Sequence, residues 1–235
     1  MAAGSPGGTG LDSDRTLAED LLLLLFQPGS GTFAGEGTLF YVLAGAVLTD
    51  LGLGGHVRTR TGRLGSTTVE AVAERPPPDR LLRAGWEYVA DRSRGVQGVL
   101  AATGPTLREP LLDRLVERGD LRRSRRRSLG LFTFSVLEEG GTGRREELLG
   151  AVRRVLDDRV DPTPRTAALV ALLYGSGALA QLDPDIPWTA RVIARAEELK
   201  EGSWGAGAAA EAVTRTTTTH IVNSVIAATA ARPRG

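Results

Sequence analysis

The pattern of apolar and polar positions predicts a protein built mainly from α-helices. Five consecutive leucines, Leu21–Leu25, leave no polar face, so a helix that contains them must be buried on nearly all sides. Thr16 and Glu19 have the spacing of a capping box, which indicates a helix over Asp20–Phe26. A second apolar helix is predicted over Glu36–Leu51, where apolar residues recur at helical spacing and glycines follow.

The rest of the chain adds helices and short strands. Alternation and β-branched residues predict a small hairpin between residues 56 and 73. Further helices are expected over Asp79–Asp91, Thr106–Arg118, Glu146–Asp158, Thr163–Tyr174, Pro187–Lys200 and Gly207–Ala230. The predicted fold class is therefore mainly α with one or two short β-hairpins. The chain shows no internal repeat and no long linker, which favours a flexible tail over residues 1–14 and one globular domain over residues 15–231.

A basic segment follows the helix over Thr106–Arg118, which we expect to end at Gly119. We predict a strand over Leu121–Arg123, an arginine-loaded turn over Ser124–Ser128 and a second strand over Leu129–Leu137. The arginines of this segment are Arg122, Arg123, Arg125, Arg126 and Arg127.

Positive charge is concentrated here and not elsewhere. Residues 104–127 contain eight arginines and four acids, a net charge of +4, whereas the whole chain has a net charge of +1. So dense a local field indicates a partner that carries phosphate groups. The second strand adds apolar character, since alternation places Phe132 and Phe134 on one of its faces. We expect one of them to be exposed in the monomer and covered in a dimer or on a bilayer; the alternative is that both faces are buried within the monomer.

The composition of the chain and the absence of known motifs narrow the classes of function that we expect. The hydrophobic fraction of 41% suffices for a core, the chain has no cysteine, and its two histidines are too few for a typical zinc site. Phosphate-cradling glycine motifs and catalytic nucleophile motifs are absent, so we expect neither an enzyme nor a cofactor or metal. The longest purely apolar run, Leu21–Phe26, is shorter than the about 20 residues of a membrane span, and the first dozen residues do not resemble a signal peptide. We therefore expect a cytoplasmic protein.

Five segments occur in an order and spacing that resemble the Golgi phosphoprotein 3 family. They are LAEDLLLL near the start, LAGAVLTDLGLGGHV at Leu43–Val57, LVERGDL at Leu115–Leu121, LGLFTF at Leu129–Phe134 and DPTPRTAALVALLYGSGAL at Asp161–Leu179. The chain resembles a bacterial member of this family. The resemblance implies a mainly α domain that associates with membranes as a peripheral protein. Eukaryotic members recognise phosphatidylinositol 4-phosphate and sort membrane enzymes. It therefore implies binding of anionic headgroups at the inner face of the membrane and an adaptor role toward cytoplasmic tails of membrane proteins.

The resemblance also implies a lipid pocket. In the family, a tryptophan and an arginine come from the region matching Phe33–Gly45, and two basic residues come from the start of the helix matching Thr106–Arg118. Arg108 matches the second of these basic residues, whereas Pro105 and Ala44 stand where two of the others would be. The arginines at 122–127 would supply charge from the hairpin side. A cation at a helix N-terminus opposes the helix dipole, which favours a ligand-binding role for Arg108 over a plain surface charge.

Two other classes of function fit the same pattern. A helix followed by a basic hairpin is also typical of a winged-helix nucleic-acid binder, although Glu109, Asp113 and Glu117 on that helix would face the phosphates. A protein–protein adaptor without lipid specificity would instead use the basic segment to bind an acidic tail. The hairpin is also a candidate surface for homo-oligomerisation.

Overall fold

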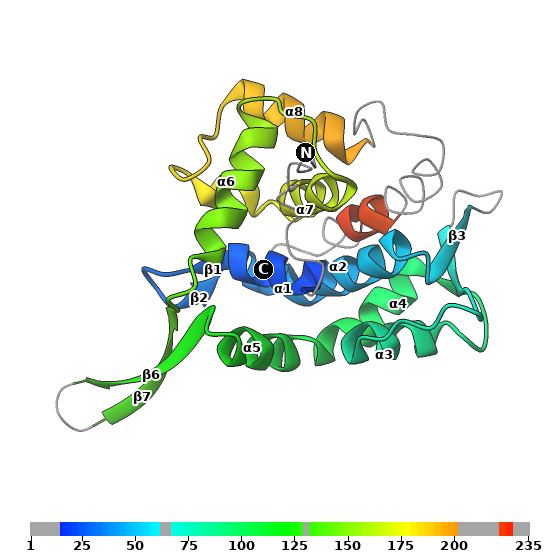
Figure 1. Cartoon of the computed structure of the whole chain (residues 1–235), viewed down its shortest axis with the longest axis horizontal. Helices are drawn as coiled ribbons and strands as arrows, with labels where there is room; N and C mark the ends of the chain where they lie inside the picture. Colours follow the sequence, from blue (N-terminus) through cyan, green and yellow to red (C-terminus); the bar gives the residue numbers. More distant parts are fainter. Residues whose placement is uncertain (1–14, 62–66, 129–131, 202–220, 228–235) are drawn as a thin grey trace, which may run out of the picture.

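The computed structural model describes residues 15–61, 67–128, 132–201 and 221–227. Its helices form three layers (Figure 1). The middle layer contains α1 (Leu17–Leu25) and α2 (Leu39–Leu53). One outer layer contains α3 (Arg80–Tyr88), α4 (Val96–Thr103) and α5 (Arg108–Glu117), and the other contains α6 (Arg144–Leu156), α7 (Pro164–Gly175) and α8 (Ala190–Lys200). The 3-10 turns are η1 (Glu36–Thr38), η2 (Gly104–Thr106) and η3 (Leu179–Leu182). The predicted mainly α class is confirmed.

Helix α1 is the centre of the core. Every one of its residues is buried, as the leucine run predicted. The capping box is present: the Thr16 side chain accepts from the Glu19 amide, and the Glu19 carboxylate accepts from the Thr16 amide. The predicted start at Asp20 is wrong, because a capping box places its glutamate at the third helical position and the helix therefore begins at Leu17.

Helix α2 packs against α1 and is almost as apolar. Among the described residues, Glu36–Leu53 is long and apolar enough to cross a membrane, but most of this segment is buried inside the fold. Burial of this kind is typical of the core helix of a globular protein. The prediction of a single helix from Glu36 needs a small correction, since the first turn is the 3-10 turn η1 and the α-helix begins at Leu39.

Within the described residues, the strands form three small antiparallel sheets. They are β1 (Phe26–Gln27) with β2 (Thr32–Phe33), then β3 (Val57–Thr61) with β4 (Thr67–Ala71) and β5 (Arg94–Gly95), and finally β6 (Leu121–Ser128) with β7 (Phe132–Glu139). The hairpin predicted between residues 56 and 73 is confirmed as β3–β4. The β1–β2 pair and the third strand β5 were not predicted, because two-residue strands leave no periodic pattern in the sequence.

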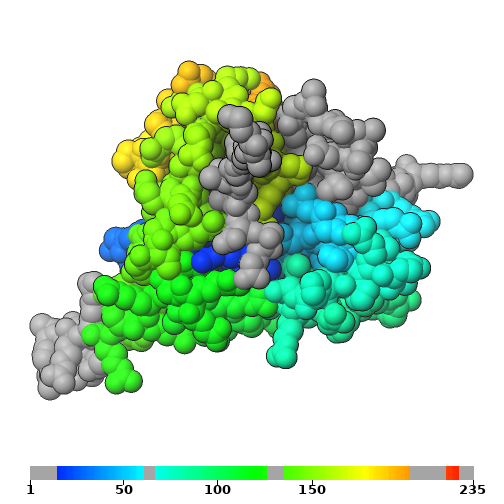
Figure 2. All heavy atoms as spheres, viewed as in Figure 1, coloured from blue at the N-terminus to red at the C-terminus, as the bar shows by residue number. Residues whose placement is uncertain are grey.

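The predicted arginine-loaded turn is wrong. Residues 124–128 belong to β6, which pairs with β7 from Leu121 opposite Glu139 to Ser128 opposite Phe132. The β6–β7 hairpin stands out from the helical body (Figure 1), so a strand here does not have to bury its charges. The helical layers fill the body of the molecule behind it (Figure 2). The described part of the second strand is β7, which runs from Phe132 to Glu139, and its predicted start at Leu129 lies outside the described residues.

Other element boundaries also differ from expectation. Helix α8 begins at Ala190 and not at Pro187, because the Thr189 side chain accepts from the Val192 amide and caps the helix there. Helix α4 was not predicted, since it is only eight residues long and contains Gly98, a weak helix former. Of the last predicted helix, residues 221–227 are helical and bury an apolar face in the core, and the remainder lies outside the described residues, as does the tail over residues 1–14.

Candidate functional site

Arg108 lies at the first position of α5, and its guanidinium meets the segment that follows β2. The guanidinium carbon is 5.5 Å from the centre of the Phe33 ring, and Nη1 forms an ion pair with the Glu36 carboxylate. The two charged side chains remain 44% and 50% exposed. Leu107, at the N-cap position, provides no side-chain cap for the helix. The Arg108 guanidinium is therefore held near the buried Phe33 ring, with its charge accessible to solvent.

Local backbone geometry brings these two segments together. Gly35 has φ +67°, and its carbonyl accepts from the Thr38 amide, which turns the chain so that Glu36 opens η1. On the other side, a Cβ atom at Gly104 would lie 2.5 Å from the Phe40 carbonyl oxygen. Only glycine therefore lets η2, and with it the start of α5, approach α2 this closely. The regions that the resemblance assigns to a lipid pocket are neighbours in this fold.

The positions that differ from the family pattern contribute no charge. Ala44 is fully buried inside α2, where an ionised side chain would need a partner, and Pro105 is exposed in η2. Arg108 is therefore the basic residue that this chain supplies at the family's four pocket positions.

The arginines of β6 lie on the projecting hairpin, and the acids around them were not recognised as partners from the sequence. Arg122 forms an ion pair of 2.9 Å with Glu138, its cross-strand neighbour. Arg123 reaches across to α5, where its guanidinium is 2.9 Å from Asp113 and 3.6 Å from Glu109.

Arg125 is exposed and has no hydrogen bond or ion pair with any residue that the structure describes. The side chains of Arg126, Arg127, Phe132 and Phe134 lie outside the described part, although their backbone pairing places Arg126 opposite Phe134. The predicted exposure of the two phenylalanines therefore stays a prediction.

Two of the eight arginines in residues 104–127 turn away from this surface. Arg114 is 2.7 Å from Asp79, which caps α3, and 3.5 Å from Glu19. Arg118 is 3.1 Å from the other oxygen of Glu19, whose side chain is fully buried. The count of eight arginines therefore overstates the positive charge available to a partner, because Arg114 and Arg118 neutralise acids within the fold.

A further group of charges lies in the interior and ties the layers together. Asp20 of α1 pairs with Arg144 of α6 at 2.9 Å and with Arg165 of α7 at 2.8 Å. Arg165 also pairs with Asp50 of α2 at 3.1 Å. Burial raises the pKa of Asp50 to about 7, although Arg165 and the Leu17 amide favour its charged form. This interior network holds α1 against its neighbours.

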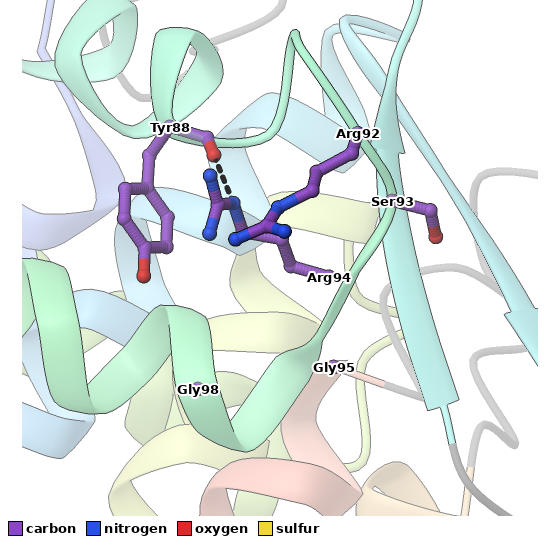
Figure 3. A pocket seen from close by; sticks show the side chains of 6 residues that line it. All are labelled: Tyr88, Arg92, Ser93, Arg94, Gly95 and Gly98. Atoms are coloured by element: carbon purple, nitrogen blue, oxygen red, sulfur yellow. Dashed lines mark hydrogen bonds between the residues drawn. The ribbon is translucent and has the colours of Figure 1, made fainter.

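A shallow pocket of about 310 Å³ lies where α3 ends and α4 begins (Figure 3). Its lining includes Tyr88, Arg92 and Arg94. Nε of Arg94 donates to the Tyr88 carbonyl oxygen at 2.6 Å, and its guanidinium lies 4.2 Å from the centre of the Tyr88 ring. The Arg94 guanidinium is thus engaged in contacts within the fold. The pocket shares no residue with the Arg108 site. Within the described ranges, no three histidines or acids are placed to hold a metal ion.

Comparison with known proteins identifies the family. No curated protein matches the sequence. The model of the family described as Golgi phosphoprotein 3 (GPP34) matches residues 17–216, which is most of the 235-residue chain and includes Arg108 and the β6–β7 hairpin. Because the match extends over far more than half of its length, the chain belongs to the Golgi phosphoprotein 3 (GPP34) family.

Proposed function

We propose that this protein binds anionic phospholipid headgroups at the inner face of a membrane, as a peripheral protein without catalytic activity. The observation that carries the proposal is the position of Arg108, exposed at the start of α5 and held over the Phe33 ring beside the other region of the family's lipid pocket. The ligand class is a phosphorylated headgroup of the phosphatidylinositol 4-phosphate type. Bound to the membrane in this way, the protein acts as an adaptor for cytoplasmic tails of membrane proteins.

The chemistry of arginine fits this ligand. A guanidinium presents its N–H donors in a planar fork that pairs with two phosphate oxygens at once. Each arginine close to an anionic membrane surface contributes about 1 kcal/mol, and salt screens the attraction within a distance of about 8 Å at physiological ionic strength. The exposed side chains of Arg122, Arg123 and Arg125 therefore add an electrostatic contribution to the contact made by Arg108.

The hairpin supports a surface-contact role. It stands out from the body, and its sequence combines arginines with Phe132 and Phe134 (Figure 1). Cationic and apolar residues together are typical of a surface that meets the interfacial region of a bilayer. A second copy of the hairpin is the alternative occupant of the same surface.

The exposed face of α5 favours a membrane over nucleic acid. Leu111, Leu112 and Leu115 are buried, which leaves Glu109, Asp113 and Glu117 on the outside. A recognition helix in a DNA groove would place all of these carboxylates against phosphates, where like charges repel, whereas the proposed membrane contact uses Arg108 at the start of the helix.

The test replaces the hairpin arginines. A variant with serine at Arg122, Arg123, Arg125, Arg126 and Arg127 should lose most of its co-sedimentation with anionic vesicles, because each arginine contributes about 1 kcal/mol. The matched control carries the same charge change on a different surface, with serine at Arg58, Arg60, Arg75, Arg80 and Arg92, all exposed. Neutral vesicles and duplex DNA are measured in parallel at two salt concentrations. Unchanged co-sedimentation of the hairpin variant, or preferential binding to DNA, would contradict the proposal.

A further inference from the structure

We propose that Glu36 is an intramolecular competitor that lowers the affinity of Arg108 for a phosphorylated headgroup. This inference rests on the function proposed above, since it assigns a regulating residue to the same site. A headgroup that binds Arg108 must first displace the carboxylate that already neutralises it.

The contact between the two residues supports direct competition. Glu36 Oε1 binds Arg108 Nη1, so the carboxylate occupies a donor that a phosphate oxygen would use. The pair lies at the surface, with both side chains about half exposed. The Phe33 ring, 5.5 Å from the guanidinium carbon, is a second contact of Arg108 that does not involve Glu36.

Glu36 is held loosely, as a displaceable group must be. It lies between Gly35 and Gly37, and a Cβ atom at Gly37 would have nothing within 4 Å. The neighbouring residues therefore place no side chain against the Glu36 carboxylate. The structure shows no second partner for the Glu36 carboxylate among the described residues. An exposed ion pair of this kind contributes little to stability, so an anionic ligand can replace it.

A substitution that removes the competitor should raise affinity. Glu36→Gln keeps the size of the side chain and removes its charge. The binding of vesicles of phosphatidylcholine with a minor fraction of phosphatidylinositol 4-phosphate should tighten roughly two- to fivefold, the range expected when an exposed ion pair no longer has to be broken.

The matched control separates competition from the general effect of net charge. Glu117 is exposed, lies on α5 and has no ion pair with a described residue, so Glu117→Gln changes the net charge equally without touching Arg108. We expect a clearly smaller gain from it. In an Arg108→Gln background, Glu36→Gln should give only the gain seen with the control, because the group for which Glu36 competes is gone.

The outcomes distinguish this inference from the proposed function. Equal gains from Glu36→Gln and Glu117→Gln, or a loss of affinity with Glu36→Gln, would overturn the competition; if Arg108→Gln still weakens binding, the proposed function stands. If neither the natural protein nor Glu36→Gln binds the vesicles, both fail. Inorganic phosphate is titrated in parallel, and a gain confined to free phosphate would overturn the assignment to a lipid.

Discussion

Asp50 should make the protein less stable as the pH rises toward neutrality. Its carboxyl group is buried between α1, α2 and α7, where it faces the Arg165 guanidinium, the Asp20 carboxylate and the Leu17 amide. Burial raises the pKa of Asp50 from its ordinary value of 3.8 to about 7. The folded protein therefore holds this proton more tightly than the unfolded chain does.

The sign and size of the effect follow from linkage. A group with a raised pKa in the folded state contributes stability that is complete below its unfolded pKa and is lost as the pH passes its folded pKa. The difference between 3.8 and about 7 corresponds to about 4 kcal/mol of unfolding free energy, at 1.36 kcal/mol per pH unit. Between about pH 5 and about pH 8 the contribution of this one group should fall by roughly 2.5 kcal/mol.

The assay is urea unfolding across this pH range for the natural protein and for Asp50→Asn. The asparagine side chain keeps an oxygen that accepts from the Leu17 amide, but it does not ionise. The pH-dependent contribution of residue 50 to the unfolding free energy should therefore be absent in this variant. The difference between the two proteins isolates Asp50, because the histidines and the other acids titrate in both. Parallel pH profiles for the two proteins would refute the reasoning and show that Asp50 ionises normally in the fold.

Three further predictions concern the core, the hairpin and the C-terminal segment. Leu23 is 1% exposed in α1, so Leu23→Asp should unfold the protein by burying an unpaired carboxylate at a cost of several kcal/mol; a soluble variant with cooperative melting would contradict this placement. Phe134→Ser should weaken self-association or vesicle binding and leave the melting temperature nearly unchanged. A large drop in melting temperature, without a specific loss of self-association or vesicle binding, would show that this face of the strand belongs to the core. A Cβ atom at Gly175 would lie 2.2 Å from Ile226, so Gly175→Ala should cost about 1–3 kcal/mol in urea unfolding, and Ile226→Ala in the same chain should recover part of it; an undiminished loss in the double variant would rule out this clash as the cause.

Much of the helical framework could be predicted from local sequence. The capping box at Thr16 and Glu19, the buried leucine run, and the Thr163 cap followed by Pro164 each act within one turn of helix, and each is present in the structure. The same local reasoning failed for the arginine-rich segment, which was predicted as a turn and is a strand. Its local sequence is compatible with both, and the surroundings of the segment in the fold decide between them. A hairpin that projects from the body tolerates charges on both faces, and the sequence does not show that it projects.

The sequence by itself determined the fold class, the family resemblance and the concentration of arginines, since these depend on residue type, order and periodicity. The tertiary structure alone decided which arginines stay exposed and which pair with acids of the fold. Arg108 meets Glu36 across 72 positions of sequence, and Arg118 meets the buried Glu19 across 99. Ion pairs of this kind depend on how helices and loops pack, and charge acts through space without regard to separation along the chain. A count of charges therefore located the basic segment, and only the packing showed that Arg118 is used inside the fold and that Arg108 already has an anionic partner.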